Sequence, residues 1–220
     1  MGAWRENEFL RTRPAAAGIA GLALVLVVAG SSAAQTPGTY QIDSQASRIE
    51  VDVFRGGLLG GLGDNHVILI ADFSGATTGS QDGKWRVNVV AQSASLTVAD
   101  KGISDSTRRE IQNTMLGPTQ VDAARFPTIE LHAQAEIPGN APGSLWVDAE
   151  LTLHGVRRRV EFPVVWSQNG DSLRVEGKAK LHLRDFNIEP ISRGLGTVKV
   201  KNEFAVVYSI TLHRVAANGM

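Results

Sequence analysis

The sequence predicts an all-β fold: a single antiparallel eight-stranded barrel with one short helix capping an end. Two observations favour this fold. Apolar and polar residues alternate across four successive segments between Leu145 and Leu212, and only one short helix is predicted after residue 40. A period of two is typical of strands with one buried face. Because no layer of helices can cover that face, the sheet is expected to close on itself around an apolar interior.

Eight strands are predicted, over residues 40–55, 66–75, 85–98, 127–137, 144–156, 158–168, 171–186 and 198–214. Gly, Asn and Asp turn signals separate most of them, and the clearest hairpin signal is Asn169-Gly170 between two alternating runs. The helix is predicted over 105–116 (DSTRREIQNTML). There Thr107 and Glu110 have capping-box spacing, and Gly117-Pro118 ends the helix. An eight-stranded barrel is either filled by side chains or holds one ligand, and the pattern does not choose between them.

The first 34 residues predict a secretory signal peptide. Three arginines (Arg5, Arg11 and Arg13) precede an apolar core over 15–30, which leads into small residues at 31–34. Cleavage after Ala33 or Ala34 would leave a barrel domain over 40–215 in the periplasm or the medium. The alternative is a membrane anchor formed by residues 15–34, although the apolar core falls slightly short of the ~20 residues that span a bilayer.

Composition narrows the classes of function. The formal net charge is zero, so nucleic acid is not an expected partner. The absence of cysteine excludes disulfides, thiolate metal sites and a cysteine nucleophile. No serine lies in a GxSxG elbow, and no nucleophile–base pair can be identified. We therefore predict no catalytic residue, and we expect no cofactor and no metal.

Candidate ligand-contacting residues are the larger side chains on the apolar faces, which either line a cavity or fill a core. These residues are Val147, Leu151, Leu153, Phe162, Val164, Trp166, Val175, Leu181, Phe204, Val206 and Tyr208. Tyr208 would add one hydroxyl for a polar head group. Further candidates for a head group at the barrel rim are Asp64, His66 and Arg184.

Two groups of polar residues, one around His66 and one at 157–159, allow both a functional and a structural interpretation. Asp64 and His66 follow a glycine-rich stretch and could serve a metal-assisted enzyme or redox accessory, but two ligands make a poor metal site. Asp64 and Asn65 are more simply explained as turn residues. Arg157, Arg158 and Arg159 are expected in a solvated turn, with transient contact to anionic lipid as the alternative. His154, His182 and His213 fall on polar strand faces and are expected in solvent.

Several segments, in order, resemble the YceI-like family of exported, lipocalin-like proteins. The resemblance covers roughly residues 40–213. It rests on 40–43 (YQID) with Ser47, the helix and its sequel from Arg108 to Ile129, 151–156 (LTLHGV) with 160–164 (VEFPV), and 184–188 (RDFNI). Relatives often read GHNH where residues 63–66 read GDNH, which puts a histidine-pair role in doubt. The resemblance implies a binding protein rather than an enzyme: a lipocalin-like barrel that carries a polyisoprenoid, an isoprenoid quinone, a fatty amide or a similar long-chain amphiphile. A second copy of the chain is a further expected partner.

Overall fold

The computed structural model describes residues 37–56, 65–136, 143–193 and 198–216. Residues 1–34, on which the signal peptide and the membrane anchor were predicted, lie outside the described residues, as does Asp64. Within the described part of the chain, no helix is both long enough and apolar enough to cross a bilayer.

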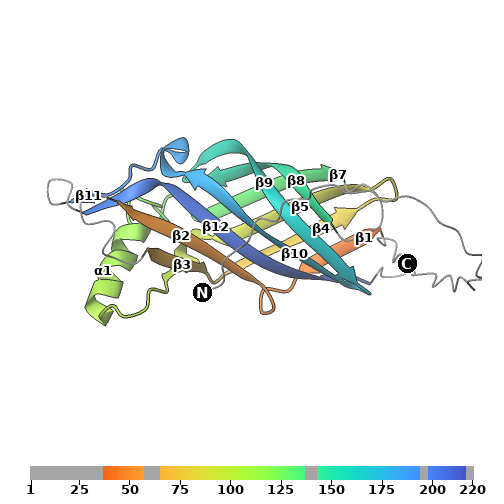
Figure 1. Cartoon of the computed structure of the whole chain (residues 1–220), viewed down its shortest axis with the longest axis horizontal. Helices are drawn as coiled ribbons and strands as arrows, with labels where there is room; N and C mark the ends of the chain where they lie inside the picture. The colour runs from red at the N-terminus through yellow and green to blue at the C-terminus, as the bar shows by residue number, and fades with distance from the viewer. Residues whose placement is uncertain (1–36, 57–64, 137–142, 194–197, 217–220) are drawn as a thin grey trace, which may run out of the picture. The chain divides into compact units, whose positions relative to one another are not determined.

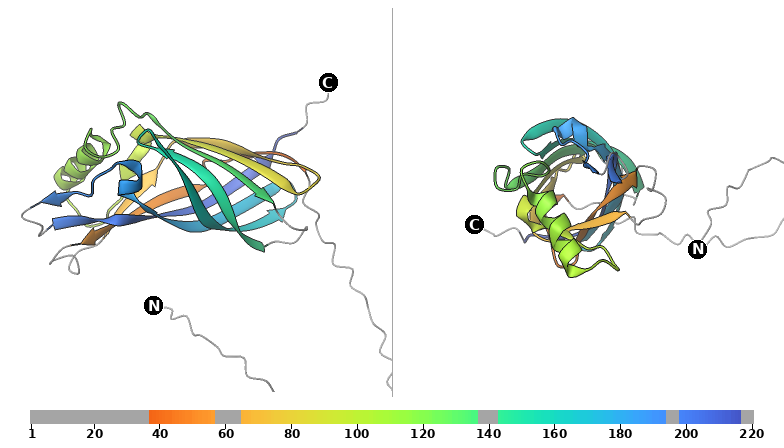
Figure 2. Two further views of the ribbon diagram at one scale, coloured as in Figure 1. Left: turned by 90° about the horizontal axis from the view of Figure 1, so that it is seen from above. Right: turned by 90° about the vertical axis from the view of Figure 1, so that its left-hand side faces the viewer.

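The predicted closed antiparallel barrel is confirmed (Figures 1 and 2). Hydrogen-bonded neighbours run in the order β1-β4-β5-β7-β8-β9-β10-β12, and β12 pairs with β1 to close the ring. The ring strands are β1 (Gly38–Ile42), β4 (Phe73–Gly79), β5 (Lys84–Gln92), β7 (Thr128–Glu136), β8 (Gly143–Leu153), β9 (Val156–Asn169), β10 (Ser172–His182) and β12 (Val198–Arg214). The short strand β11 (Ser192–Arg193) pairs with β12.

Three further strands lengthen the barrel toward α1 (Asp105–Leu116). They are β2 (Arg48–Gly56), β3 (His66–Ile70) and β6 (Leu96–Val98), paired in the order β12-β2-β3-β6. Each of the first three predicted strands therefore corresponds to two observed strands separated by a bend: β1 and β2, β3 and β4, and β5 and β6. The bends put α1 beside β6, at the end of the ring that faces the viewer on the right of Figure 2.

Polar side chains cause these bends. The carboxylate of Asp43 accepts hydrogen bonds from the backbone N–H groups of Gln45 and Ala46, which turns the chain between β1 and β2. Ser47 then exchanges side-chain hydrogen bonds with the backbone of Thr211 in β12. Ser95, in the 3₁₀ helix η1 (Ser93–Ser95), accepts from the backbone N–H of Asp72 at the break between β3 and β4. Local side-chain bonds thus replace the regular ladder.

The helix α1 has the predicted bounds but a different cap. Ser104 is its N-cap, and its hydroxyl accepts a hydrogen bond from the backbone N–H of Thr107 at 3.1 Å. The predicted Thr107–Glu110 capping box is therefore wrong, because Ser104 takes that role three residues earlier. Gln112 fixes α1 to the edge of β6: its amide accepts from the N–H of Val98 and donates to the carbonyl of Leu96. The helix thus occupies the β6 edge in place of a strand.

Two tight hairpins join the strands of the predicted alternating region. Gly170 (φ 56°) and Asp171 form the two-residue β9–β10 turn, and Asn169 pairs with Ser172 across it, so the hairpin predicted at Asn169-Gly170 is confirmed. His154 (φ 52°) and Gly155 (φ 69°) form the β8–β9 turn, and Leu153 pairs with Val156 directly across it. Because β9 begins immediately after this turn, the three consecutive arginines lie in the strand and not in the turn, which corrects the prediction for 157–159.

Candidate functional site

The interior of the barrel is a cavity of about 500 Å³. This volume falls within the range of small-molecule sites. Many inward-facing side chains, among them Val51, Leu131 and Val175, are only half-buried although they point into a closed barrel. They face empty space rather than one another. The structure therefore resolves the alternatives left by the sequence in favour of a hollow interior.

All eleven side chains predicted for the apolar faces line this cavity; they are Val147, Leu151, Leu153, Phe162, Val164, Trp166, Val175, Leu181, Phe204, Val206 and Tyr208. Their placement follows from strand pairing, because residues opposite one another on neighbouring strands point to the same face. Val206, for example, pairs with Ala179 of β10 and Val51 of β2, and all three are apolar. Contact of these side chains with a ligand stays a prediction.

The part of the chain before Leu145 supplies about as many lining residues as the part from Leu145 onward. Trp85, Val87, Val89 and Ala91 alternate along β5 and line the cavity. Further lining comes from β2, β3, β6 and α1; these residues include Ile49, Val51, Val53, Ile68, Ile70, Leu96, Ile111 and Met115. The period of two in residues 85–91 is visible in the sequence and could have identified the β5 residues.

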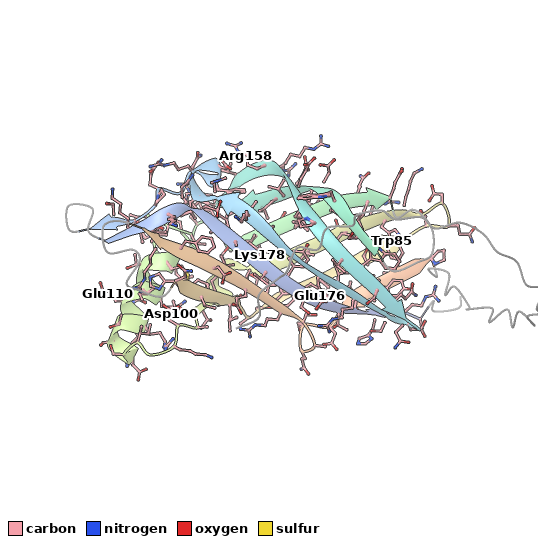
Figure 3. All side chains as sticks on the ribbon, viewed as in Figure 1. Trp85, Asp100, Glu110, Arg158, Glu176 and Lys178 are labelled. Carbon is pink, nitrogen blue, oxygen red and sulfur yellow. The ribbon has the colours of Figure 1, made fainter. Side chains whose placement is uncertain are left out.

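Aromatic side chains close the cavity at the end opposite α1. Tyr40 is fully buried and packs against Trp85, with ring centroids 5.8 Å apart. Trp166 and Leu212 complete the same buried cluster. The hydroxyl of Tyr40 accepts a hydrogen bond from Gln168 at 2.9 Å, so its polar atom is satisfied within the protein. Figure 3 shows Trp85 toward this end of the barrel, far from Asp100 and Glu110. The deep end of the cavity is thus apolar and closed.

Most of the polar lining residues gather toward α1; Thr77, opposite Tyr40 in the β1–β4 pair, is an exception, and its hydroxyl donates to the backbone carbonyl of Arg86. His66 begins β3, Glu110 and Thr114 lie on α1, and Gln120 follows the helix. A long molecule with one polar end would therefore keep its apolar part among the strands and its polar end near α1. This orientation avoids the free-energy cost of burying a polar group without a hydrogen bond.

The hydroxyl of Tyr208, predicted as a contact for a polar head group, has its proton engaged within the protein. The hydroxyl donates a hydrogen bond to the carbonyl oxygen of Pro163 at 2.6 Å. The ring reaches that carbonyl by lying over Gly177, where any Cβ would meet it. Burial raises the pKa of the Tyr208 phenol far above its ordinary value. The side chain is therefore an uncharged part of the wall.

Of the rim candidates, His66 lines the cavity and Arg184 does not. The imidazole Nδ1 of His66 lies 2.5 Å from a carboxylate oxygen of Asp100, a residue that the sequence interpretation missed. Arg184, in the 3₁₀ helix η2 (Leu183–Phe186), is exposed and contacts Glu189 at 3.2 Å. Asn65 accepts a hydrogen bond from the backbone N–H of Arg55, which fits the turn role predicted for it. Asp64 falls outside the described residues.

The remaining histidines lie away from the cavity, and His154 is placed differently from its prediction. It is half-buried in the β8–β9 turn, where its Nδ1 donates a hydrogen bond to the carbonyl oxygen of Phe186. Its ring packs edge-on against Phe126, with ring centroids 4.6 Å apart. His182 and His213 are exposed beside Asp185 and Asp43, respectively. Among the described residues, no three acidic or histidine side chains come together as a metal site.

Arg157 and Arg159 of β9 lie on the outer surface of the barrel, whereas the exposed Arg158 lies opposite the lining residue Leu151 of β8. Arg159 pairs with Asp148 of β8 at 2.7 Å, and Arg157 approaches Glu150 at 3.7 Å. Arg158, labelled in Figure 3, donates to the backbone carbonyl of Asp185 in η2. Exposed pairs of this kind contribute little to stability, but they balance the local charge.

A closed antiparallel barrel around an apolar cavity is the architecture of a protein that binds small molecules in its interior. The sequence matches the YceI-like domain over residues 40–212, and the chain belongs to this family. The expected resemblance is therefore confirmed. Comparison with curated proteins gave no match.

Two solved structures resemble the fold. BcnA from Burkholderia cenocepacia has a TM-score of 0.60 at 16% identity, covering 77% of this chain and 98% of BcnA. A polyisoprenoid binding domain from Saccharophagus degradans, implicated in plant cell wall breakdown, has a TM-score of 0.58 at 13% identity. That comparison covers 82% of this chain and all of the domain. At these identities the likeness establishes the fold.

Proposed function

We propose that this chain is an exported carrier that holds one long-chain apolar or amphipathic molecule inside its barrel. The ligand classes that fit are a polyisoprenoid, an isoprenoid quinone or a fatty amide. The observation that carries the proposal is the apolar cavity of about 500 Å³, closed at the end opposite α1 and with most of its polar residues near α1. The similar structure described as a polyisoprenoid binding domain supports the same class of ligand.

The driving force needs no specific polar contact. Removing apolar surface from water contributes ~25 cal/mol per Å², or ~0.8 kcal/mol for each methylene. A tail that enters the barrel therefore gains affinity with each carbon, whereas a short or branched head gains little. This relation explains how a wall of Val, Leu, Ile and Phe side chains can select for length with few hydrogen bonds.

Native mass spectrometry of the protein purified from its own host tests this proposal. We expect a bound molecule of one mass or a homologous series, released by organic solvent and identified as a long-chain compound. An interior that emerges empty, from a protein that also takes up no isoprenoid quinone or fatty amide after delipidation, would contradict the proposal.

We also propose that the protein is exported from the cytoplasm. The N-terminal composition supports secretion to the periplasm or the medium, and N-terminal sequencing of the mature protein would test cleavage after Ala33 or Ala34. Retention of residues 15–34 in the membrane fraction would favour the anchor instead. Transient membrane contact and a homodimer remain predictions, tested by vesicle sedimentation and by measurement of mass in solution.

A metal-assisted enzyme or redox accessory at His66 is the alternative class of function. No observation on the described residues favours it, because Asp100 occupies the Nδ1 side of the imidazole and no third ligand joins them. Metal analysis of the purified protein, with His66→Ala as control, separates the two classes. Stoichiometric metal that is lost on substitution would favour the alternative.

A further inference from the structure

His66 is the one histidine of the described residues that lines the cavity. Strand pairing places it there, because His66 lies opposite Val53 of β2, another lining residue. The next inward residue of β3, Ile68, pairs with Val98 of β6. The inward stripe of β6 then continues from Val98 to Asp100, so a carboxylate comes to lie beside the imidazole.

Asp100 is held in one orientation by contacts on both of its carboxylate oxygens. Its Oδ1 accepts a hydrogen bond from the backbone N–H of Val67 at 2.7 Å, and its Oδ2 lies 2.5 Å from Nδ1 of His66. Its side chain is only 6% exposed, and that of His66 is 16% exposed. From α1, the guanidinium of Arg108 donates to the backbone carbonyls of Val98 and Asp100, which fixes this segment and brings a positive charge beside it.

These contacts determine which nitrogen of His66 carries the proton. A carboxylate only accepts hydrogen bonds, so Nδ1 must be the donor to Asp100. In the neutral imidazole, Nε2 then has no proton and is an acceptor. Among the described residues, Nε2 has no hydrogen-bond partner. In this form of the imidazole, a fixed acceptor therefore lies at the end of the cavity near α1, where Glu110, Thr114 and Gln120 also line it.

Resting on the proposed carrier function, we propose that His66 and Asp100 form the subsite for the ligand's polar head, and that this subsite takes a hydrogen-bond donor. The class of ligand is a long-chain alcohol or phenol, whose hydroxyl donates to Nε2. A head that only accepts hydrogen bonds, such as an ether, ester or ketone, leaves Nε2 without a partner. His66 is the contact residue and Asp100 the residue that positions it.

A matched pair of ligands tests the subsite: a long-chain isoprenoid alcohol and its methyl ether, which share one tail. Their dissociation constants are measured on the delipidated full chain and on two variants. In His66→Asn the side-chain amide can still donate to Asp100 in the place of Nδ1, but the Nε2 position is lost. We expect the affinity for the alcohol to fall about tenfold in this variant, which corresponds to the loss of roughly one hydrogen bond. The affinity for the ether should be unchanged.

The variant Asp100→Asn changes the tautomer. The new amide oxygen accepts the hydrogen bond from the backbone N–H of Val67. The NH₂ group therefore faces Nδ1 of His66 and donates to it. Nδ1 then accepts and Nε2 becomes a donor. We expect the ether to gain about tenfold in affinity, because its oxygen now accepts from Nε2. A purely structural role for Asp100 predicts loss of affinity for both ligands and no gain for either.

The outcomes separate this inference from the proposed function. If neither ligand binds, the head-group subsite is overturned, and the carrier function itself is contradicted when an isoprenoid quinone and a fatty amide also fail to bind. If both bind and the alcohol-to-ether ratio is the same in wild type and His66→Asn, the carrier stands and the head-group subsite is overturned. Nitrogen-15 NMR of the wild-type imidazole provides a check that needs no variant: we expect a protonated Nδ1 and an unprotonated Nε2, and either the opposite tautomer or a ring protonated at both nitrogens would overturn the assignment.

Discussion

Replacing Val206 with Phe is expected to weaken the binding of a long-chain ligand roughly 100-fold. Val206 lies on β12, half-buried, and faces the cavity beside the small side chain of Ala179. Phenylalanine has four carbons more than valine, so the variant displaces about as many ligand carbons from the barrel. At ~0.8 kcal/mol for each buried methylene the loss is about 3 kcal/mol, which corresponds to roughly two decades in the dissociation constant.

The next residue supplies the control. Val207 pairs with Lys178 and Glu50 and its side chain is exposed on the outside of the barrel, so Val207→Phe makes the same chemical change on the opposite face. Displacement of a fluorescent long-chain probe from delipidated protein measures both variants, and thermal unfolding shows that both are folded. Equal dissociation constants for Val206→Phe and Val207→Phe would refute binding inside the barrel.

Three further changes test the framework of the barrel. Gly177→Ala is expected to lower the free energy of unfolding by ~2 kcal/mol, because its Cβ meets the Tyr208 hydroxyl and the Pro163 carbonyl, whereas Tyr208→Phe loses only a hydrogen bond worth ~1 kcal/mol. Urea titration ranks the two, and the reverse order would contradict this packing. Gln112→Ala leaves the N–H of Val98 without its acceptor, so hydrogen exchange at that amide should accelerate, and unchanged exchange would mean that α1 does not protect β6. Hydrogen bonds from Ser80 and the contact with Lys84 lower the pKa of Asp82 to about 2, so this carboxylate stabilises the fold above its ordinary pKa near 4 and loses that contribution as the pH falls toward 2. The difference in thermal midpoint between wild type and Asp82→Asn should therefore shrink over that interval, and a difference that does not depend on pH would exclude the mechanism.

The strand faces and the helix were predictable because both depend on local patterns. A period of two assigned every predicted lining residue from Val147 to Tyr208 to the inner face, and a helical run that stops at Gly117-Pro118 gave the bounds of α1, although the predicted cap was wrong. The same alternation implied closure, since no other element covers the apolar face.

What the sequence did not predict depends on contacts between distant residues. His66 and Asp100 are 34 positions apart, and they meet only through the register of β3 and β6. The Tyr208 hydroxyl reaches Pro163 because Gly177 leaves room, which no local pattern reveals. The bend at Asp43 and Ser47 arises from side-chain bonds that compete with a ladder to β12. Hydrogen-bonded turns and rims are therefore the least predictable part of this barrel.

The central claim is that the barrel encloses a long-chain molecule with its tail among the strands. A crystal structure of the protein purified from its own host tests it most directly. We expect continuous elongated density along the cavity, in contact with Val175 and Val206 and ending in a polar group near His66. An interior filled by ordered water, or by side chains that have collapsed onto one another, would contradict the account.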